Sequence, residues 1–253
     1  MSGSFLPYVS GGNPKPVYPH GSLNYLNAAG TGTTWGPVSA SGPTGYSTAT
    51  LEFWFRFNSL PTAGTWYGIC SSGSAGTGVD GIAVSTLGWR VGNGLTVYGT
   101  PPNPNQWYAI AITKTGATTG NFFLDGVLVT SFTSAPPTWV IFGTGLVGKG
   151  WFWGTIVTSY ANWANSTGTL SQISSSNQAF TRLSSNVRYT ANYTVSSSFP
   201  PFYSDASTVY LNYVDPAKAA GDTTMFADSS PNGNNGVVST VPTLAQGSAA
   251  VPF

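Results

Sequence analysis

Alternating apolar and polar positions mark this chain as a β-sheet protein. The clearest stretch is LEFWFRF at 51–57, in which Leu or Phe fills every odd position. Side chains of an extended strand point alternately to opposite sides, so these apolar residues should enter a core. Glu52 and Arg56 lie on the other face, where we expect them to flank Trp54, as a cross-strand charge pair or in a cation–π contact.

Similar short apolar runs recur along the chain with turn signals between them. Asp125-Gly126 separates two such runs, and this pair favours a two-residue hairpin because both turn positions need positive φ. Residues 160–182 are polar and predict only a short helical turn near Leu170 and Ile173. The pattern therefore predicts an all-β fold, an antiparallel β-sandwich. The other expected strands cover 81–85, 89–91, 95–98, 107–114, 122–129, 138–142, 151–158 and 208–213.

The length of 253 residues fits one large sandwich domain. Residues 1–20 are rich in Gly and Pro, and we expect them to form an extended N-terminal arm before a single domain at 21–253. The last 50 or so residues are too few to build much of a core alone. We therefore expect 203–240 to fold back and complete the sandwich, with pairing to a neighbouring subunit as the alternative.

Charged residues are scarce in this chain. It has eight Lys or Arg and seven Asp or Glu, and only 6% of its residues are charged, against about 25% in an average globular domain. A surface with so little charge offers little repulsion to association, which favours a homo-oligomer or a multicopy assembly. The net charge of +1, without a basic cluster, argues against nucleic acid and membrane surfaces as partners.

The usual catalytic groups are also missing. A glycoside hydrolase needs two carboxylates across the bond, but Glu52 is the only glutamate and has no carboxylate two residues away. His20 is the only histidine and Cys70 the only cysteine, which argues against a catalytic triad, a zinc site and a disulfide within the chain. The sequence thus predicts a protein that is not an enzyme and has no cofactor.

Several segments together resemble the laminin G-like, or concanavalin A-like, jelly-roll family. The resemblance is carried by SLNYLN at 22–27, LEFWFRF at 51–57, NQWYAI at 105–110 and FFLDGVLV at 122–129. A further part, at 209–213 and 226–236, resembles the family's opening segment but here follows the rest of the domain. The chain thus resembles a circularly permuted jelly roll, or one that carries the first piece of a second copy.

Calcium is the one ion that this resemblance suggests. Laminin G-like modules often hold it with Asp or Asn side chains and backbone carbonyls. Asp80, or Asp228 with Asn232 and Asn234, would supply such oxygens here. The alternative is that these residues set turn geometry through local hydrogen bonds.

The resemblance extends to modules common in structural proteins of tailed bacteriophages. It implies a virion surface protein that decorates or cements a capsid through contacts with capsid or other virion proteins. The N-terminus lacks a basic region and an apolar stretch typical of a secretory signal, so we expect synthesis in the host cytoplasm. The aromatic residues expected to make the protein contacts are Phe5, Tyr8, Tyr18 and Phe253.

The alternative function is a receptor-binding tail-fibre adhesin, or a lectin, that recognises host surface polysaccharide. Aromatic side chains stack well on sugar rings, and this chain has nine tryptophans. The absence of a trimerisation signature speaks against the adhesin, and the absence of an export signal against the lectin. The tryptophans near expected loops or strand ends, our candidate sugar contacts, are Trp35, Trp66, Trp89 and Trp139.

Overall fold

The structure is a computed structural model. It describes residues 22–26, 35–37, 47–72, 80–91, 96–116, 119–132, 152–153, 169–171, 175–197, 201–213, 228–233, 236–238 and 243–247. Every regular element within these ranges is a β-strand. The described part of the chain accordingly holds no helix of the length and apolarity that crossing a membrane requires.

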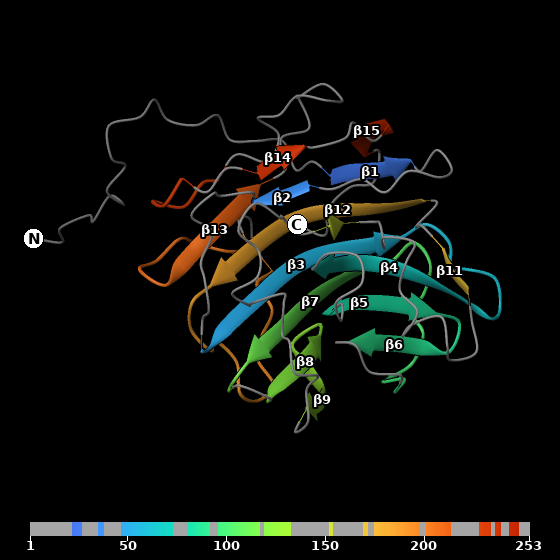
Figure 1. Cartoon of the computed structure of the whole chain (residues 1–253), viewed down its shortest axis with the longest axis horizontal. Coiled ribbons are helices and arrows are strands. Elements are labelled where there is room, and N and C mark those ends of the chain that lie inside the picture. The colour runs from blue at the N-terminus through green and yellow to red at the C-terminus, as the bar shows by residue number, and fades with distance from the viewer. Residues whose placement is uncertain are drawn as a thin grey trace, which may run out of the picture.

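Most of the fold is one large antiparallel sheet. Its eight strands follow the order β15-β1-β12-β3-β7-β8-β9, and β13 also pairs with β12 (Figure 1). Two strands thus share one edge of β12, because β1 pairs with its first half and β13 with its second half. The strands are β1 (Ser22–Leu26), β3 (Ala49–Phe57), β7 (Trp107–Lys114), β8 (Gly120–Leu124), β9 (Val127–Phe132), β12 (Ser175–Ser184), β13 (Thr208–Tyr213) and β15 (Thr243–Gly247).

A second sheet of five strands completes the sandwich. Its order is β10-β4-β5-β6, and β11 pairs with β4 in parallel. A third, two-stranded sheet joins β2 (Trp35–Pro37) to β14 (Gly236–Val238). The strands of the second sheet are β4 (Thr65–Ser72), β5 (Asp80–Ser85), β6 (Gly88–Val91), β10 (Phe152–Trp153) and β11 (Thr169–Ser171).

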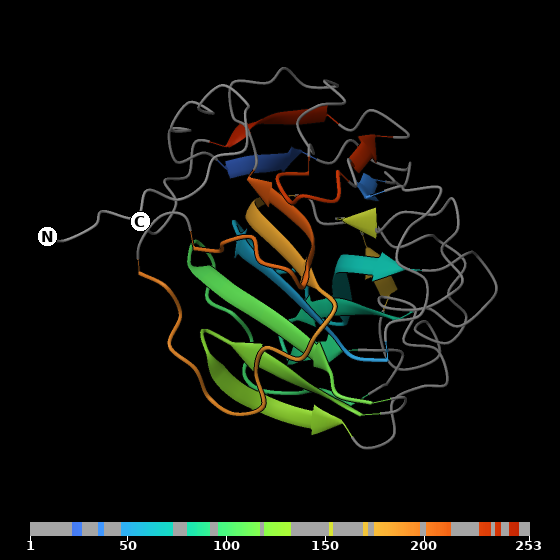
Figure 2. The same ribbon diagram turned by 90° about the vertical axis from the view of Figure 1, so that its left-hand side faces the viewer.

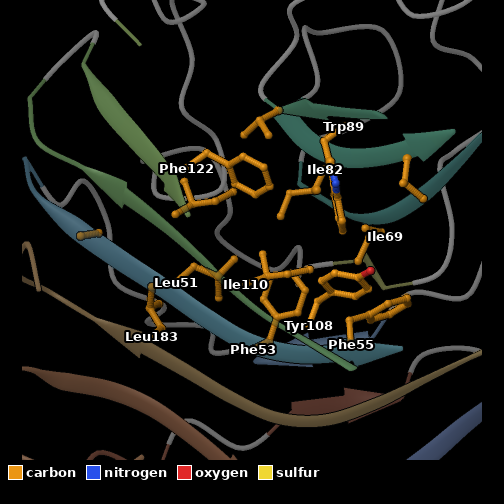
Figure 3. Packing of buried hydrophobic residues seen from close by; sticks show 14 of the residues in the cluster. Leu51, Phe53, Phe55, Ile69, Ile82, Trp89, Tyr108, Ile110, Phe122 and Leu183 are labelled. Carbon is orange, nitrogen blue, oxygen red and sulfur yellow. The ribbon is translucent and has the colours of Figure 1, made fainter. Parts of the chain in front are cut away.

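The main core lies between the two larger sheets, as the close view shows (Figure 3). The apolar face of β3 supplies its centre, and the prediction for 51–57 is confirmed. Each of the four Leu or Phe side chains at 51–57 is at most 1% exposed. They pack towards Ile69, Ile82 and Trp89 from the second sheet. Burial of side chains of this size is the main stabilising contribution to such a sandwich.

The predicted hairpin is present between β8 and β9. Asp125 has φ of 50° and Gly126 has φ of 79°, as the two-residue turn requires. Asp125 Oδ1 also accepts a hydrogen bond of 2.8 Å from the backbone N–H of Ala109 on β7. This contact ties the turn to the neighbouring strand.

Of the other predicted strands, four are present, and three are found only in part or lie outside the described residues. The strands expected at 81–85, 89–91, 107–114 and 208–213 are present as β5, β6, β7 and β13. At 95–98, the described residues form only an isolated bridge from Tyr98 to Trp89. Residues 138–142 lie outside the described ranges, and of 151–158 only β10 lies within them.

The prediction for 160–182 is wrong. The described residues of this segment form strands, β11 and the first part of β12, and not a helical turn. The polar sequence suggested a segment exposed to solvent. In the fold, however, both edges of β12 are hydrogen-bonded to other strands. Its buried Arg182 pairs with an acidic residue on β3. A polar strand can occupy the middle of a sheet when its polar groups find such partners.

The C-terminal strands pair within the chain, and the last two of them pair with strands from its start. β13 pairs with β12, β14 with β2, and β15 with β1. Figure 1 shows the red and orange strands beside the blue ones. Within this chain, therefore, the late segments extend sheets that the early segments began.

Candidate functional site

The outer face of the large sheet, which points away from the second sheet, carries its own layer of side chains. A second apolar cluster lies there, with Trp54, Phe180 and Phe202 as its largest members. Residues 185–197, which we call the outer strap, cross this face after β12 ends. Figure 2 shows the strap as an orange trace passing in front of the green strands. The candidate site lies under this strap.

Hydrogen bonds attach the outer strap to the β8–β9 hairpin. The N–H of Tyr193 donates to the carbonyl oxygen of Gly126 at 2.8 Å. The N–H of Leu128 donates to Asn192 Oδ1 at 2.8 Å. Gly126 is packed so closely that a Cβ there would overlap the carbonyl oxygen of Tyr193. The turn residue that the hairpin needs is thus also the residue that lets the strap approach.

Aromatic stacking gives the strap its shape. The rings of Tyr189 and Tyr193 lie parallel, with centroids 3.5 Å apart and an interplanar angle of 8°. Both meet the ring of Phe123 on β8 edge-on, at 6.0 and 5.6 Å. Burial raises the pKa of both tyrosines above the ordinary value, with a further contribution from the charge of Glu52. The two phenols are therefore uncharged at neutral pH.

A buried ion pair lies beneath these rings. Glu52 is 1% exposed and receives two hydrogen bonds from the guanidinium of Arg182, of 2.6 and 2.8 Å. The hydroxyl of Tyr189 donates to the same carboxylate at 2.6 Å. Strand register explains the pairing, because Arg182 on β12 lies directly opposite Glu52 on β3. A charge pair buried in this way needs such close geometry to offset its loss of hydration.

Glu52 thus forms a cross-strand charge pair, as the prediction for β3 allowed, and its partner is Arg182. Arg56, on the same strand as Glu52, makes contacts of its own near the end of β3. Its guanidinium donates to Asn58 Oδ1 at 2.7 Å and to Asn105 Oδ1 at 2.9 Å. The sheet places a neighbouring strand's arginine closer to Glu52 than the strand's own.

A second ion pair holds the strap to the segment before β13. Arg188 Nη2 donates to both carboxylate oxygens of Asp205, at 2.9 and 2.8 Å. Desolvation acts to raise the pKa of Asp205. Hydrogen bonds from Ser207, Arg188 and Thr208 outweigh it and hold this pKa well below its ordinary value. The carboxylate therefore stays ionised in weakly acidic solution.

A cavity of about 160 Å³ opens where the strap crosses the sheet. Its floor is formed by Glu52, Ala109 and Ile110, from β3 and β7. Aromatic rings and hydroxyl groups share the walls. The described wall residues are Tyr189, Tyr193, Thr194, Val195, Ser196, Pro201 and Phe202.

The polar groups of the described lining of this cavity are mostly neutral. Glu52 is the only charged residue among the described lining residues, so no second carboxylate is available there for acid and base roles. The carboxylate of Glu52 already accepts hydrogen bonds from Arg182 and Tyr189. What the cavity offers a ligand is apolar ring surface and hydroxyl groups, over a floor that includes the buried carboxylate of Glu52.

The tryptophans predicted to contact sugars do not form this site. Trp66 is 1% and Trp89 0% exposed, so neither ring offers a face to a ligand, and the prediction is not retained for these two. The guanidinium of Arg90 lies 3.9 Å from the ring centre of Trp66, and Trp89 Nε1 donates to a backbone carbonyl. Trp35 lies in β2, whose side chains are outside the description, and Trp139 lies outside the described residues.

The expected protein-contact residues Phe5, Tyr8, Tyr18 and Phe253 also lie outside the described residues. They stay predictions, as does the arm at 1–20.

The residues proposed as calcium ligands make local contacts where they are described. Asp228 accepts hydrogen bonds from the N–H groups of Leu211 and Ser230, and Asn232 Nδ2 donates to the carbonyl of Thr208. Asp80 begins β5, with its side chain outside the description, and Asn234 lies outside the described residues. No group of three or more His, Cys, Asp or Glu side chains in the described ranges could hold a metal ion.

Sequence reasoning missed the outer-face site. The lone glutamate in a strand was visible, but its partner Arg182 is 130 positions away. The one local signal was the Tyr-x3-Tyr spacing at 189 and 193, which means little until the strap's path over the sheet is known.

No protein-family model matches this chain, and no curated protein matches it in sequence. Among solved structures, a candidate carbohydrate binding protein from Bacteroides ovatus matches 99% of this chain and 67% of its own, with a TM-score of 0.55 and 15% identity. Mouse laminin α1 domains LG4-5 match 68% of this chain and 46% of theirs, with a TM-score of 0.40 and 13% identity. Botulinum neurotoxin type C, whose cell entry depends on two ganglioside molecules, matches 69% and 41%, with a TM-score of 0.42 and 11% identity.

These similarities concern the fold. The chain spans less than half of the laminin and neurotoxin structures that it matches. The whole-chain match to the Bacteroides protein, together with the antiparallel sheets, confirms the predicted fold class, an all-β antiparallel sandwich.

Proposed function

We propose that this protein is a non-enzymatic carbohydrate-binding domain whose outer-face cavity holds one sugar residue. The observation that carries the proposal is the mixed lining of the cavity, in which aromatic rings, hydroxyl groups and a carboxylate converge. Sugars present both apolar C–H faces and hydroxyl groups, and binding sites of this kind combine apolar walls with a few polar groups. The similarity of the whole chain to a candidate carbohydrate binding protein supports the same function.

The size of the cavity limits the ligand and its affinity. Sites for drug-sized molecules have roughly 300–1,000 Å³. A volume of about 160 Å³ suits a single ring, such as the terminal residue of a chain. A hexose has about 12 non-hydrogen atoms, and roughly −0.3 kcal/mol per atom corresponds to about −4 kcal/mol. We therefore expect a Kd of about 1 mM for a monosaccharide.

A blocking variant tests the site. Thr194 is exposed and lines the cavity, so Thr194→Trp should fill its mouth without disturbing the core. Thr100→Trp is the matched control, because Thr100 is exposed and does not line the cavity. Binding is measured by saturation-transfer NMR with a panel of methyl glycosides. Wild type and Thr100→Trp should bind the same glycosides, and Thr194→Trp should lose them.

Two results would count against this function. Absence of binding to every glycoside and to a host-polysaccharide array would overturn it. Unchanged binding by Thr194→Trp would show that sugars bind elsewhere on the molecule. Near-UV circular dichroism of each variant establishes that the fold is intact before binding is compared.

A second proposal concerns where the domain works. The scarcity of charge favours a protein held in an assembly, and we propose a place on the surface of a virus particle, in many copies. A capsid decoration protein would act through contacts with other virion proteins. A tail-fibre adhesin would use the cavity to recognise host polysaccharide. Quantitative mass spectrometry of purified particles separates them, since hundreds of copies favour decoration and a few copies favour the adhesin. Absence from particles would overturn the virion placement.

A further inference from the structure

The charges around the outer-face cavity are arranged asymmetrically. Glu52 lines the cavity, while its partner Arg182 is not among the described lining residues. The ion pair between them is therefore oriented with its negative end towards the ligand. An ion pair is neutral as a whole, but at short range a ligand experiences chiefly the nearer charge.

The cations nearby are engaged in other contacts. Arg182 donates to both oxygens of Glu52 and, at 3.2 Å, to the carbonyl oxygen of Tyr203. Its guanidinium also lies over the ring of Phe202, 4.8 Å from the centroid. Arg188 donates to both oxygens of Asp205, and its Nε lies 3.7 Å from Glu52 Oε2, so a second guanidinium also partly balances the charge of Glu52. Neither guanidinium therefore faces the cavity in a way that would let it bind a ligand carboxylate through two hydrogen bonds.

The tyrosines add hydroxyl groups and no positive charge. Their raised pKa values keep Tyr189 and Tyr193 neutral, so they present ring surface and phenol oxygens at all moderate pH values. The hydroxyls of Thr194 and Ser196 are neutral too. The polar surface of the described lining thus consists of neutral hydroxyls and one anion.

We infer that the cavity selects uncharged sugars and rejects sugars that carry a carboxylate, such as uronic and sialic acids. This inference rests on the proposed carbohydrate-binding function and specifies its ligand class. A second carboxylate would have to enter beside Glu52 without a cation facing it. Two carboxylates that lie side by side near a protein surface repel each other strongly. Arg182 partly offsets the charge of Glu52, so we expect the repulsion to weaken the affinity for a uronate about tenfold.

Matched ligands test the charge directly. The methyl glycoside that binds best in the neutral panel is compared with its uronic acid and with the corresponding uronamide. The uronamide has nearly the shape of the acid but no charge. We expect the hexoside and the uronamide to bind within about threefold of each other, and the uronate about tenfold more weakly. High salt should recover little of the loss, because the repelling group is buried.

The outcomes separate this inference from the function on which it rests. If no sugar binds, the proposed function fails and the inference falls with it. If the uronate binds as well as the hexoside or better, sugar binding stands and the charge selection is wrong. If the uronamide is rejected as strongly as the uronate, size rather than charge excludes them, and the inference is also wrong.

A protein variant provides an independent check. Glu52→Gln keeps the shape of the side chain but leaves the positive charge of Arg182 without its balance. The tenfold discrimination against the uronate should shrink to less than threefold, or reverse. Unchanged discrimination in a folded Glu52→Gln protein would contradict the inference. If this variant does not fold, the uronamide comparison with wild type still decides.

Discussion

The outer strap passes close to Gly126, and replacing this glycine with alanine tests the arrangement of strap and hairpin. Gly126 has φ of 79°, and an added Cβ would overlap the backbone oxygen of Tyr193. It would also approach a side-chain atom of Val195 at 3.2 Å. The substitution therefore brings two costs, backbone strain and a steric clash that pushes the strap away.

Gly64 makes it possible to separate the two costs. It has φ of 81°, nearly the same as Gly126, but an added Cβ would meet nothing within 4 Å. Gly64→Ala should thus report the strain alone, about 1–2 kcal/mol of unfolding free energy. Gly126→Ala adds the clash, which costs about 1–3 kcal/mol more. We expect a total loss of about 2–5 kcal/mol at Gly126.

Urea unfolding followed by tryptophan fluorescence measures both variants against wild type. The unfolding midpoint should fall further for Gly126→Ala than for Gly64→Ala. Sugar binding should weaken only in Gly126→Ala, since the displaced strap carries the cavity wall. Equal destabilisation of the two variants would refute the close approach of strap and hairpin and, with it, the shape of the site.

Two further predictions concern aspartates. The folded pKa of Asp205 lies below its unfolded value, so its contribution to stability is present above about pH 4 and is lost as the pH falls through the folded pKa. Wild type should thus lose stability between about pH 5 and pH 2. The loss should be modest because Asp205 is exposed. In urea titrations over the same pH range, Asp205→Asn should lose less stability than wild type. Asp228 accepts one hydrogen bond from Leu211 on β13 and two from Ser230, so Asp228→Ala should cost about 1–3 kcal/mol and increase self-association in size-exclusion chromatography. An Asp228→Ala protein that is as stable as wild type and elutes at the same volume would contradict that role.

Local patterns predicted the parts of this fold that depend on local physics. The alternation at 51–57 predicted which face of β3 enters the core, because strand geometry by itself sends neighbouring side chains to opposite sides. Asp125-Gly126 predicted the hairpin, because the turn requires positive φ at both positions. Both predictions needed only a few consecutive residues.

Predictions that depended on a residue's surroundings were less successful. Trp66 and Trp89 were chosen as sugar contacts from their places near strand ends, but both are buried. Strand β12 was overlooked because its polar residues looked suited to solvent, whereas the sheet buries Arg182 against an acidic partner. Composition indicates how many aromatic and polar side chains exist, but not which of them other strands will cover.

By itself, the sequence determined the all-β class, the core face of β3, the hairpin turn and the scarcity of charge. The tertiary structure alone decided that Glu52 meets Arg182, and that the outer strap crosses the sheet to form a cavity over this pair. The physical reason is the separation of 130 positions between these two residues. Their contact depends on which strands become neighbours, and the periodicity of a single strand does not specify its neighbours.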